Sequence, residues 1–213
     1  RAADNSVVFR AETDEVLVEK RFTLEPHRYR LTMTVAVANK SSRPLDHGLV
    51  VHLYAAQDPA KRGGGFWDYA SANLAEMVCL VGDKVQRSPV EALVKESQSH
   101  VGGVRWAAAG DKYFTIAAVP MPEIPPRERG CKQQALDNER AEVALSFASR
   151  SVAPGQKTEY PFVVFGGPKI TSELEAVRAG GEDARLADLV DVTFAVLSRP
   201  MLGLLKQFYR LTG

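Results

Sequence analysis

Alternation with a period of two is the strongest feature of this chain, and it is clearest in YRLTMTVAVAN at residues 29–39. One face of this stretch carries the large apolar residues, Tyr29, Leu31, Met33, Val35 and Val37. Successive side chains of a strand point to opposite faces, so the pattern predicts a half-buried antiparallel strand. Further strand-like runs or hairpins occur at 7–11, 15–24, 49–56, 78–87, 104–119, 141–149 and 160–168.

The arrangement of these runs predicts the fold class. Roughly nine to twelve short strands precede a small helical tail, and strands do not alternate with helices. A single β domain often reaches ~200–250 residues, and this chain has 213. We therefore expect a mainly β fold, a large antiparallel β-sandwich over residues 1–170, followed by a helical segment over residues 171–213 that packs on it.

Two helices are predicted in that last segment. Ser172 and Glu175 form a capping-box pattern for a helix that runs to about Arg178 and ends at the glycine pair 180–181. A second helix begins near Pro200. Its apolar residues follow helical spacing, at Met201, Leu204, Leu205, Phe208 and Leu211. Basic residues lie on the opposite side, so this amphipathic helix either docks on the domain or lies at a membrane interface.

Composition argues against several classes of function. The 27 basic and 26 acidic residues leave a net charge of +1, so the charge balance indicates neither nucleic acid nor an acidic ligand. No apolar run approaches the ~18 residues of a membrane-spanning helix. No signal peptide is visible, and both ends read as cut from a longer protein.

The sequence carries none of the common motifs for nucleotide binding or hydrolysis, GxGxxG, GxxxxGK[ST], GxSxG or HExxH. The four histidines are His27, His47, His52 and His100. The odd spacing of His47 and His52 would put them on opposite faces of a strand, so they form a poor ligand pair. We expect no catalytic residue, no metal and no cofactor, and hence no enzyme.

The stretch VRWAAAGDKYFTIAAVP at residues 104–120 predicts a hairpin rather than an active site. Asp111 suits the turn, where its side chain can accept hydrogen bonds from backbone amides. Adjacent strand residues point to opposite faces, so Lys112 would not converge with Asp111 on one substrate. Three aromatic residues are expected to pack on the sheet, Trp106, Tyr113 and Phe114.

A second motif, FGGPK at residues 165–169, predicts a corner between a strand and a helix. Gly166 and Gly167 allow a positive φ or the close approach of another backbone. Pro168 then ends the strand.

The two cysteines, Cys79 and Cys131, match no metal-binding spacing. Each lies in a context typical of a loop, MVCLVGDK and RERGCKQQ. They are either two free thiols or a disulfide, which requires an oxidising compartment, and composition leaves both possibilities open.

Three stretches together carry a resemblance to a known family, and from about residue 7 to its end the chain resembles the large periplasmic domain of the YidC family of bacterial membrane-protein insertases. EVLVEKRFTLEPHRYRLTMTVAVAN resembles the early strands of that family. VRWAAAGDKYFTIAAVP resembles its hairpin, through Trp106, Lys112, Tyr113 and Phe114. FVVFGGPKITSEL, with ADLVDVTFAVLSRPMLGLLKQFY after it, resembles its corner and its approach to the next membrane span, through Gly167, Pro168 and Lys169. Residues 57–100 match poorly.

The resemblance implies a β-supersandwich similar to galactose-mutarotase-like and carbohydrate-binding sandwiches. It implies a place at the periplasmic face of the inner membrane of a Gram-negative bacterium, between the first and second spans of a multi-pass protein. That protein inserts and folds membrane proteins, alone or with the Sec translocon and SecDF accessory proteins. Its insertase groove lies in the membrane core, so no groove residue is carried over to this chain. An oxidising periplasm favours a disulfide between Cys79 and Cys131.

Three functions follow as hypotheses. The first is a non-catalytic interaction or scaffold domain for Sec accessory proteins or substrates, in which Met201, Leu204, Leu205 and Phe208 face a partner or the membrane. The second is a carbohydrate-binding or mutarotase-like module. Its candidates for stacking on a sugar are Phe66, Trp67 and Tyr69, which otherwise pack within the irregular segment 57–78. The third is a holdase with an exposed apolar cleft.

Overall fold

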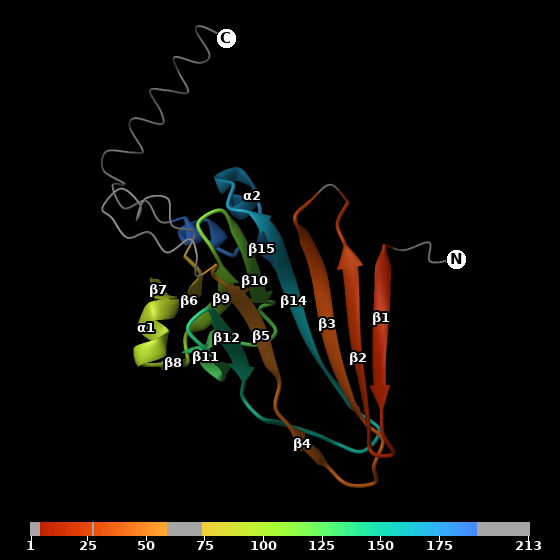
Figure 1. Ribbon diagram of the computed structural model, residues 1–213. Coiled ribbons are helices and arrows are strands. Elements are labelled where there is room, and N and C mark those ends of the chain that lie inside the picture. The colour runs from red at the N-terminus through yellow and green to blue at the C-terminus, as the bar shows by residue number, and fades with distance from the viewer. Residues whose placement is uncertain (1–4, 27, 59–73, 191–213) are drawn as a thin grey trace, which may run out of the picture.

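Two antiparallel sheets form the framework of the computed structural model, which describes residues 5–26, 28–58 and 74–190 (Figure 1). The larger sheet has eight strands in the order β1-β2-β3-β14-β10-β9-β6-β7. Their bounds are β1 Ser6–Glu12, β2 Val16–Leu24, β3 Arg30–Asn39, β14 Lys157–Pro168, β10 Phe114–Pro120, β9 Val104–Gly110, β6 Glu76–Val81 and β7 Lys84–Pro89. The prediction of a mainly β fold built on a large antiparallel sandwich is confirmed.

The smaller sheet has four strands in the order β5-β12-β11-β8. Their bounds are β5 Val50–Ala56, β12 Arg140–Phe147, β11 Arg129–Ala135 and β8 Gln98–Val101. The remaining elements are short, and they are β4 Leu45–His47 paired with β13 Arg150–Val152, β15 Arg178–Ala179 paired with β16 Glu182–Asp183, the helices α1 Val90–Lys95 and α2 Thr171–Glu175, and the 3-10 turns η2 Pro126–Glu128 and η3 Leu186–Leu189.

The core lies between the two sheets, and β3 explains how the sequence places it there. Met33, Val35 and Val37 are buried, as the alternation predicts, while the residues between them are only half-buried. Phe162 on β14 pairs with Met33, and the ring of Phe147 on β12 meets that of Phe162 edge-on with centroids 5.5 Å apart. The apolar faces of the two sheets therefore share one interior.

A disulfide crosses this interior. Cys79 lies in β6 of the larger sheet and Cys131 in β11 of the smaller one, and the two residues are bonded. Both are almost fully buried. The expectation that each cysteine lies in a loop is wrong, because the turn at Gly82 begins only beyond the end of β6 and both cysteines sit within strands.

The chain from 171 to 190 covers the opposite face of the larger sheet. Leu174, Leu186 and Leu189 are buried there against residues of the sheet such as Trp106 and Phe165. The indole Nε1 of Trp106 donates a hydrogen bond to the carbonyl oxygen of Ala184 at 3.0 Å. This segment is therefore a third layer, held to the sheet by apolar packing and by side chains that bind its backbone.

The helix predicted from Ser172 to Arg178 is shorter than expected. It ends at Glu175, and its N-cap is Ile170, with no side-chain capping hydrogen bond. The glycine pair does not end a helix: Gly180 and Gly181 have φ values of +60° and +84° and form the turn of the β15–β16 hairpin. Glycine is favoured at both positions because a side chain is strained at positive φ.

The hairpin of β9 and β10 confirms part of its prediction. The carboxylate oxygen Oδ1 of Asp111 accepts hydrogen bonds from the amides of Tyr113 and Phe114 at 2.7 and 2.8 Å, so it is a turn residue. Trp106 is fully buried. Tyr113 and Phe114, however, are 56% and 58% exposed and do not pack into the sheet as expected. Tyr113 lies in the turn. Phe114 is the first residue of β10 and lies opposite Pro168, the last residue of β14, at the end of the sheet.

Gly167 meets a side chain instead of the backbone that we expected to approach it. Neither Gly166 nor Gly167 has a positive φ. A methyl group at Gly167 would lie 2.7 Å from Cβ and Cγ of Tyr29, whereas one at Gly166 would meet nothing within 4 Å. We expect Gly167→Ala to lower the free energy of unfolding by about 1–3 kcal/mol through overpacking. Gly166→Ala is the matched control and should change it by less than about 0.5 kcal/mol in urea denaturation. Equal effects of the two changes would contradict this explanation of the motif.

His47 has a structural role in the folded domain. Its Nε2 lies 2.9 Å from the hydroxyl of the buried Tyr160. Burial is the main cause that lowers the pKa of His47; the charge of nearby Arg150 also lowers it, whereas a hydrogen bond with the Arg150 backbone acts in the opposite direction. The unfolded chain then binds a proton more readily than the folded protein, so stability falls as pH drops through the ordinary histidine range near about 6.5. We expect His47→Gln to reduce the loss of unfolding free energy between about pH 7.5 and 5.5. An unchanged loss in urea titrations at the two pH values would contradict this.

Several predicted residues lie outside the described residues. These are His27, the aromatic candidates Phe66, Trp67 and Tyr69, and the amphipathic set Met201, Leu204, Leu205 and Phe208.

Candidate interaction surface

Strands β1, β2 and β3 extend beyond the smaller sheet, which covers the other part of the larger sheet (Figure 1). The register joins Met33 on β3 to Phe22 on β2 and Phe22 to Val7 on β1, so these three side chains share one face. Along this row Met33 is buried, Phe22 is half-buried and Val7 is 49% exposed. The core-facing surface of the sheet therefore continues into solvent without its covering layer.

A shallow apolar groove of about 510 Å³ follows this uncovered face. It is lined by Asn5, Ser6, Val7, Phe9, Phe22, Leu24 and Leu31. Phe9 and Leu24 are each 59% exposed, and the rings of Phe9 and Phe22 meet edge-on with centroids 5.9 Å apart. Contiguous exposed apolar surface of this kind is typical of interaction sites. We call the set Val7, Phe9, Phe22, Leu24 and Leu31 the apolar face.

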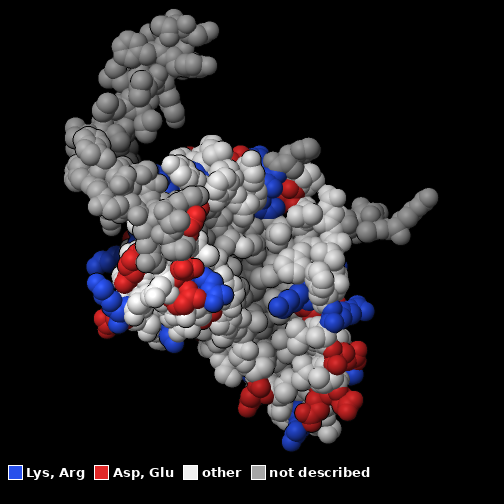
Figure 2. Space-filling model, in the orientation of Figure 1, with Lys and Arg blue, Asp and Glu red and all other residues white. Residues whose placement is uncertain are grey.

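Most charged residues of β1 to β3 lie on the opposite face of the sheet. There Arg10 pairs with Glu19 at 3.1 Å, and on the adjacent strand β14 Lys157 pairs with Glu159 at 2.6 Å. Figure 2 shows a largely uncharged surface over the upper part of β1 and β2, with charged side chains near the top of β3 and gathered toward the lower ends of the three strands. Lys20 is the residue opposite Phe9 in the ladder, so a single cation borders the apolar face there. The two faces of the same three strands are thus chemically distinct.

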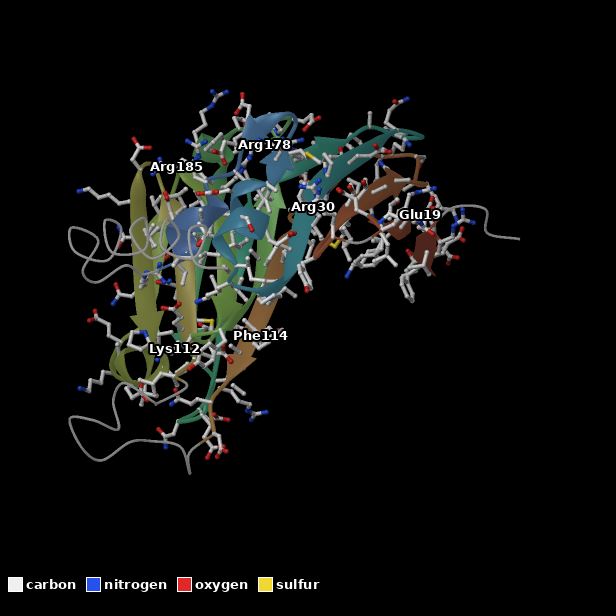
Figure 3. All side chains as sticks on the ribbon, turned by 90° about the horizontal axis from the view of Figure 1, so that it is seen from above. Glu19, Arg30, Lys112, Phe114, Arg178 and Arg185 are labelled. Atoms are coloured by element: carbon white, nitrogen blue, oxygen red, sulfur yellow. A yellow bond between two sulfur atoms is a disulfide. The ribbon has the colours of Figure 1, made fainter. Side chains whose placement is uncertain are left out.

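The hairpin with the family-motif residues is a separate place. Figure 3 shows Lys112 and Phe114 well away from Glu19 on β2. The ammonium nitrogen of Lys112 lies 5.6 Å from the ring centroid of Tyr113, a cation–π contact. Neither Asp111 nor Lys112 lines the groove at the apolar face, the cavity beside Arg129 or the cavity beside Lys157.

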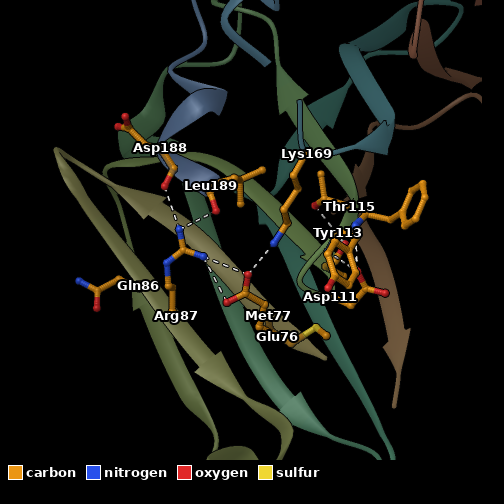
Figure 4. A network of polar contacts seen from close by, with 12 residues as sticks. Glu76, Met77, Gln86, Arg87, Asp111, Tyr113, Thr115, Lys169, Asp188 and Leu189 are labelled. Atoms are coloured by element: carbon orange, nitrogen blue, oxygen red, sulfur yellow. Dashed lines mark hydrogen bonds and ion pairs between the residues drawn. The ribbon is translucent and has the colours of Figure 1, made fainter. Parts of the chain in front are cut away.

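Lys169, the last residue of the corner motif, belongs to a polar network that the sequence did not reveal (Figure 4). Its Nζ lies 2.7 Å from the carboxylate of Glu76, which also receives a hydrogen bond from Arg87 at 3.0 Å. Arg87 donates two more hydrogen bonds, to the carbonyl oxygens of Asp188 and Leu189 at 2.9 and 2.8 Å. The network therefore ties the corner and the β6–β7 hairpin to the last residues that the structure describes before position 191.

A histidine and a carboxylate meet on the smaller sheet, although the sequence suggested no convincing pair. Nδ1 of His52 lies 3.2 Å from Oε2 of Glu142, and Gln134 donates a hydrogen bond to Oε1 of Glu142 at 2.6 Å. His52 and Glu142 are far apart in the chain, so only the pairing of β5 with β12 could reveal them. These residues line neither the groove at the apolar face nor the cavities beside Arg129 and Lys157.

Two further cavities are lined by residues that have structural roles. One of about 100 Å³ lies on the charged face between β2, β3 and β14. The other, of about 280 Å³, is bordered by Arg105, Trp106 and Arg129 and by the prolines of the loop after β10. Arg129 is buried and donates hydrogen bonds to four backbone carbonyl oxygens, and burial lowers its pKa to about 10. Its hydrogen bonds hold the loops around it, which is a structural role.

The described part of the chain contains no helix with the length and apolar character needed to span a membrane. It also contains no group of three or more histidine, cysteine, aspartate or glutamate residues placed to hold a metal ion.

Solved structures share the fold at very low identity. A GH36 α-galactosidase of Geobacillus stearothermophilus is similar with a TM-score of 0.55 and 11% identity, over 80% of this chain and 25% of that one. A galactose mutarotase-like protein of Lactobacillus casei is similar with a TM-score of 0.51 and 8% identity, over 76% of this chain and 69% of that one. These likenesses support the mutarotase-like sandwich and nothing finer.

Relatives found by sequence similarity identify the family of the chain, which the solved structures do not. Proteins named membrane protein insertase YidC from Geobacter sp. strain M21 and Pseudomonas fluorescens are 25% and 26% identical, over 93% and 94% of this chain. The chain spans 34% and 35% of their lengths, about a third of each relative. The family model for the YidC periplasmic domain matches residues 2–204. Nearly the whole chain is therefore covered, and it belongs to the family of YidC periplasmic domains.

Proposed function

We propose that this domain is a non-catalytic interaction module of a YidC-type insertase and that the apolar face is its contact surface for client polypeptides. The observation that carries the proposal is the continuation of the core-facing surface of β1 to β3 into solvent, where Phe9 and Leu24 are each 59% exposed. A monomeric domain gains stability by covering such residues, so their exposure suits a surface that is covered by a partner.

The chemistry of the clients fits this surface. Proteins that are inserted into a membrane contain long apolar segments, which are costly to expose to water. A shallow apolar groove without a charged lining can shield part of such a segment without demanding a defined sequence. The face would then act as a weak holding site, which combines the interaction module with the holdase hypothesis.

The place of the domain is part of the same proposal. We place it at the periplasmic face of the inner membrane, as one domain of a multi-pass protein, because its relatives are insertases about three times its length. Residues Met201, Leu204, Leu205 and Phe208 would position it on the membrane surface or against a partner, as their helical spacing suggests. The Sec translocon and SecDF proteins are the proposed accessory partners.

A carbohydrate-binding or mutarotase-like function is the second candidate, and the His52–Glu142 pair is the observation that favours it. A mutarotase requires an acid and a base that converge on the sugar. The pair lines neither the groove at the apolar face nor the cavities beside Arg129 and Lys157, which favours the interaction module over this function. We expect no acceleration of galactose anomer exchange, measured by polarimetry. Acceleration that is lost in Glu142→Gln would favour the enzyme instead.

The apolar face can be tested in the full-length protein. Phe9→Ser combined with Leu24→Ser makes the face polar at two exposed positions, so the unfolding free energy should fall by no more than about 1 kcal/mol. We expect fewer ribosome-bound client chains to co-purify with this variant than with the wild type. Arg21→Ser combined with Thr34→Ser changes the charged face of the same strands and is the matched control. Equal client recovery from the two variants would contradict the proposal.

A further inference from the structure

The outer edge of β1 is a free strand edge. β1 is the first strand of the larger sheet and pairs only with β2, and no strand among the described residues pairs with its other side (Figure 1). An open edge presents backbone donors and acceptors that can pair with another extended chain. This edge borders the apolar face directly, because Val7 and Phe9 belong to both.

The hydrogen-bonding phase of the ladder identifies which backbone groups are open. The amide of Leu24 donates to the carbonyl oxygen of Asn5 at 2.7 Å, and the amide of Thr13 donates to that of Val16 at 2.8 Å. The register between these two ends is continuous, so the odd-numbered residues of β1 bond to β2. The amides and carbonyls of the even-numbered residues therefore point to the open edge, at Ser6, Val8, Arg10 and Glu12.

The side chains of β1 alternate between the two sides of the sheet. Val7, Phe9 and Ala11 point to the same side as the apolar face, whereas Val8 and Arg10 point to the charged side. A strand that pairs with this edge would have its own side chains divided between the same two sides. The inward side requires apolar residues at every second position, large enough to lean over the groove.

Usual protections of a strand edge are absent from the inward side of β1. Natural edges are commonly blocked by proline, by a bulge or by an inward-pointing charge. β1 has seven residues, no proline and an unbroken register with β2, and its inward residues are uncharged. At the other margin of the same sheet, β7 ends with Pro89 and continues directly into α1.

We propose that the free edge of β1 adds an extended segment of a client polypeptide as a further strand of the larger sheet, with large apolar side chains at alternate positions lying over the apolar face. This inference rests on the proposed function, since it specifies how the same surface holds its client. Backbone pairing gives affinity without a defined sequence, and the alternating apolar positions give the preference for apolar segments.

A second copy of this chain is the other possible occupant, and the residues favour it less. Antiparallel pairing of two β1 strands about Phe9 would place Ala11 of one copy opposite Val7 of the other. The smallest inward side chain would then lie beside the groove and leave most of it uncovered. A client segment with leucine or phenylalanine at that position covers it instead.

Proline at Val8 tests the edge without breaking the sheet. The amide of Val8 points away from β2, so Val8→Pro removes an open donor and blocks the edge while the pairing with β2 remains. Val8→Ala keeps the amide and is the matched control. The probe is a fluorescent peptide of alternating leucine and threonine, ten residues long, added to the full-length protein in lipid nanodiscs.

Saturable binding to the wild type, retained by Val8→Ala and weakened at least about tenfold by Val8→Pro, is the expected result. The same peptide with alternate amides N-methylated should not bind the wild type, and this measurement does not depend on the folding of any variant. Binding that survives both Val8→Pro and N-methylation but is lost in Phe9→Ser with Leu24→Ser would overturn strand addition and leave the proposed function intact. Loss of self-association in Val8→Pro without any peptide binding would assign the edge to a second copy and overturn the inference.

Discussion

Replacing both Cys79 and Cys131 by alanine should lower the free energy of unfolding by about 4 kcal/mol. The bond links residues 52 positions apart and joins β6 of one sheet to β11 of the other, so it restricts a long loop in the unfolded chain. The chain-entropy relation for a loop of this length gives the magnitude. Urea denaturation of the wild type and of the double variant measures it.

Reductant provides the control for this prediction. Dithiothreitol should lower the stability of the wild type to about that of the double variant and leave the double variant unchanged. Two reactive thiols in the denatured, unreduced wild type would contradict the disulfide. The same result would also remove the support that the bond gives to an oxidising compartment.

Trp106→Ala should cost about 4 kcal/mol of unfolding free energy, which is within the range for a fully buried large aromatic residue. The side chain is completely buried between the larger sheet and the segment 171–190. Its removal leaves a cavity in that layer and deprives the carbonyl oxygen of Ala184 of its donor. Urea denaturation monitored by circular dichroism measures the loss.

Two control variants separate the contributions at this site. Trp106→Phe keeps most of the apolar volume but removes the hydrogen bond, and it should cost about 1–2 kcal/mol. Phe114→Ala in the same hairpin should cost less than about 1 kcal/mol, because that ring is 58% exposed. A loss for Phe114→Ala as large as that for Trp106→Ala would show that Phe114 packs on the sheet, as the sequence alone predicted.

The sequence correctly predicts the structural features that depend on residues close together in the chain. The alternation in β3 correctly separates Met33 and Val35 from the residues between them, because period-two patterning reflects which face of a strand is buried. Asp111 is correctly a turn residue because its hydrogen bonds reach only two and three residues along the chain. The fold class follows from the same local patterns and from the resemblance of three motifs.

Contacts between distant segments could not be predicted in this way. Lys169 and Glu76 are 93 positions apart, and His52 and Glu142 are 90 positions apart. The apolar face was missed for a related reason, since the sequence predicts residues 7–11 only as a strand and does not show that Val7 and Phe9 are exposed. Their exposure depends on how far the smaller sheet extends over the larger one, which no local pattern encodes.

Site-specific photocrosslinking in membranes tests most directly whether the apolar face is the client-binding surface. A photoreactive amino acid is placed in the full-length protein at Phe9 or Leu24, and at Arg21 on the charged face of the same strands as the control. With a client chain stalled during insertion, adducts with the client are expected from positions 9 and 24 and not from position 21. Client adducts from position 21 alone, or from none of the three positions while insertion proceeds normally, would contradict the account.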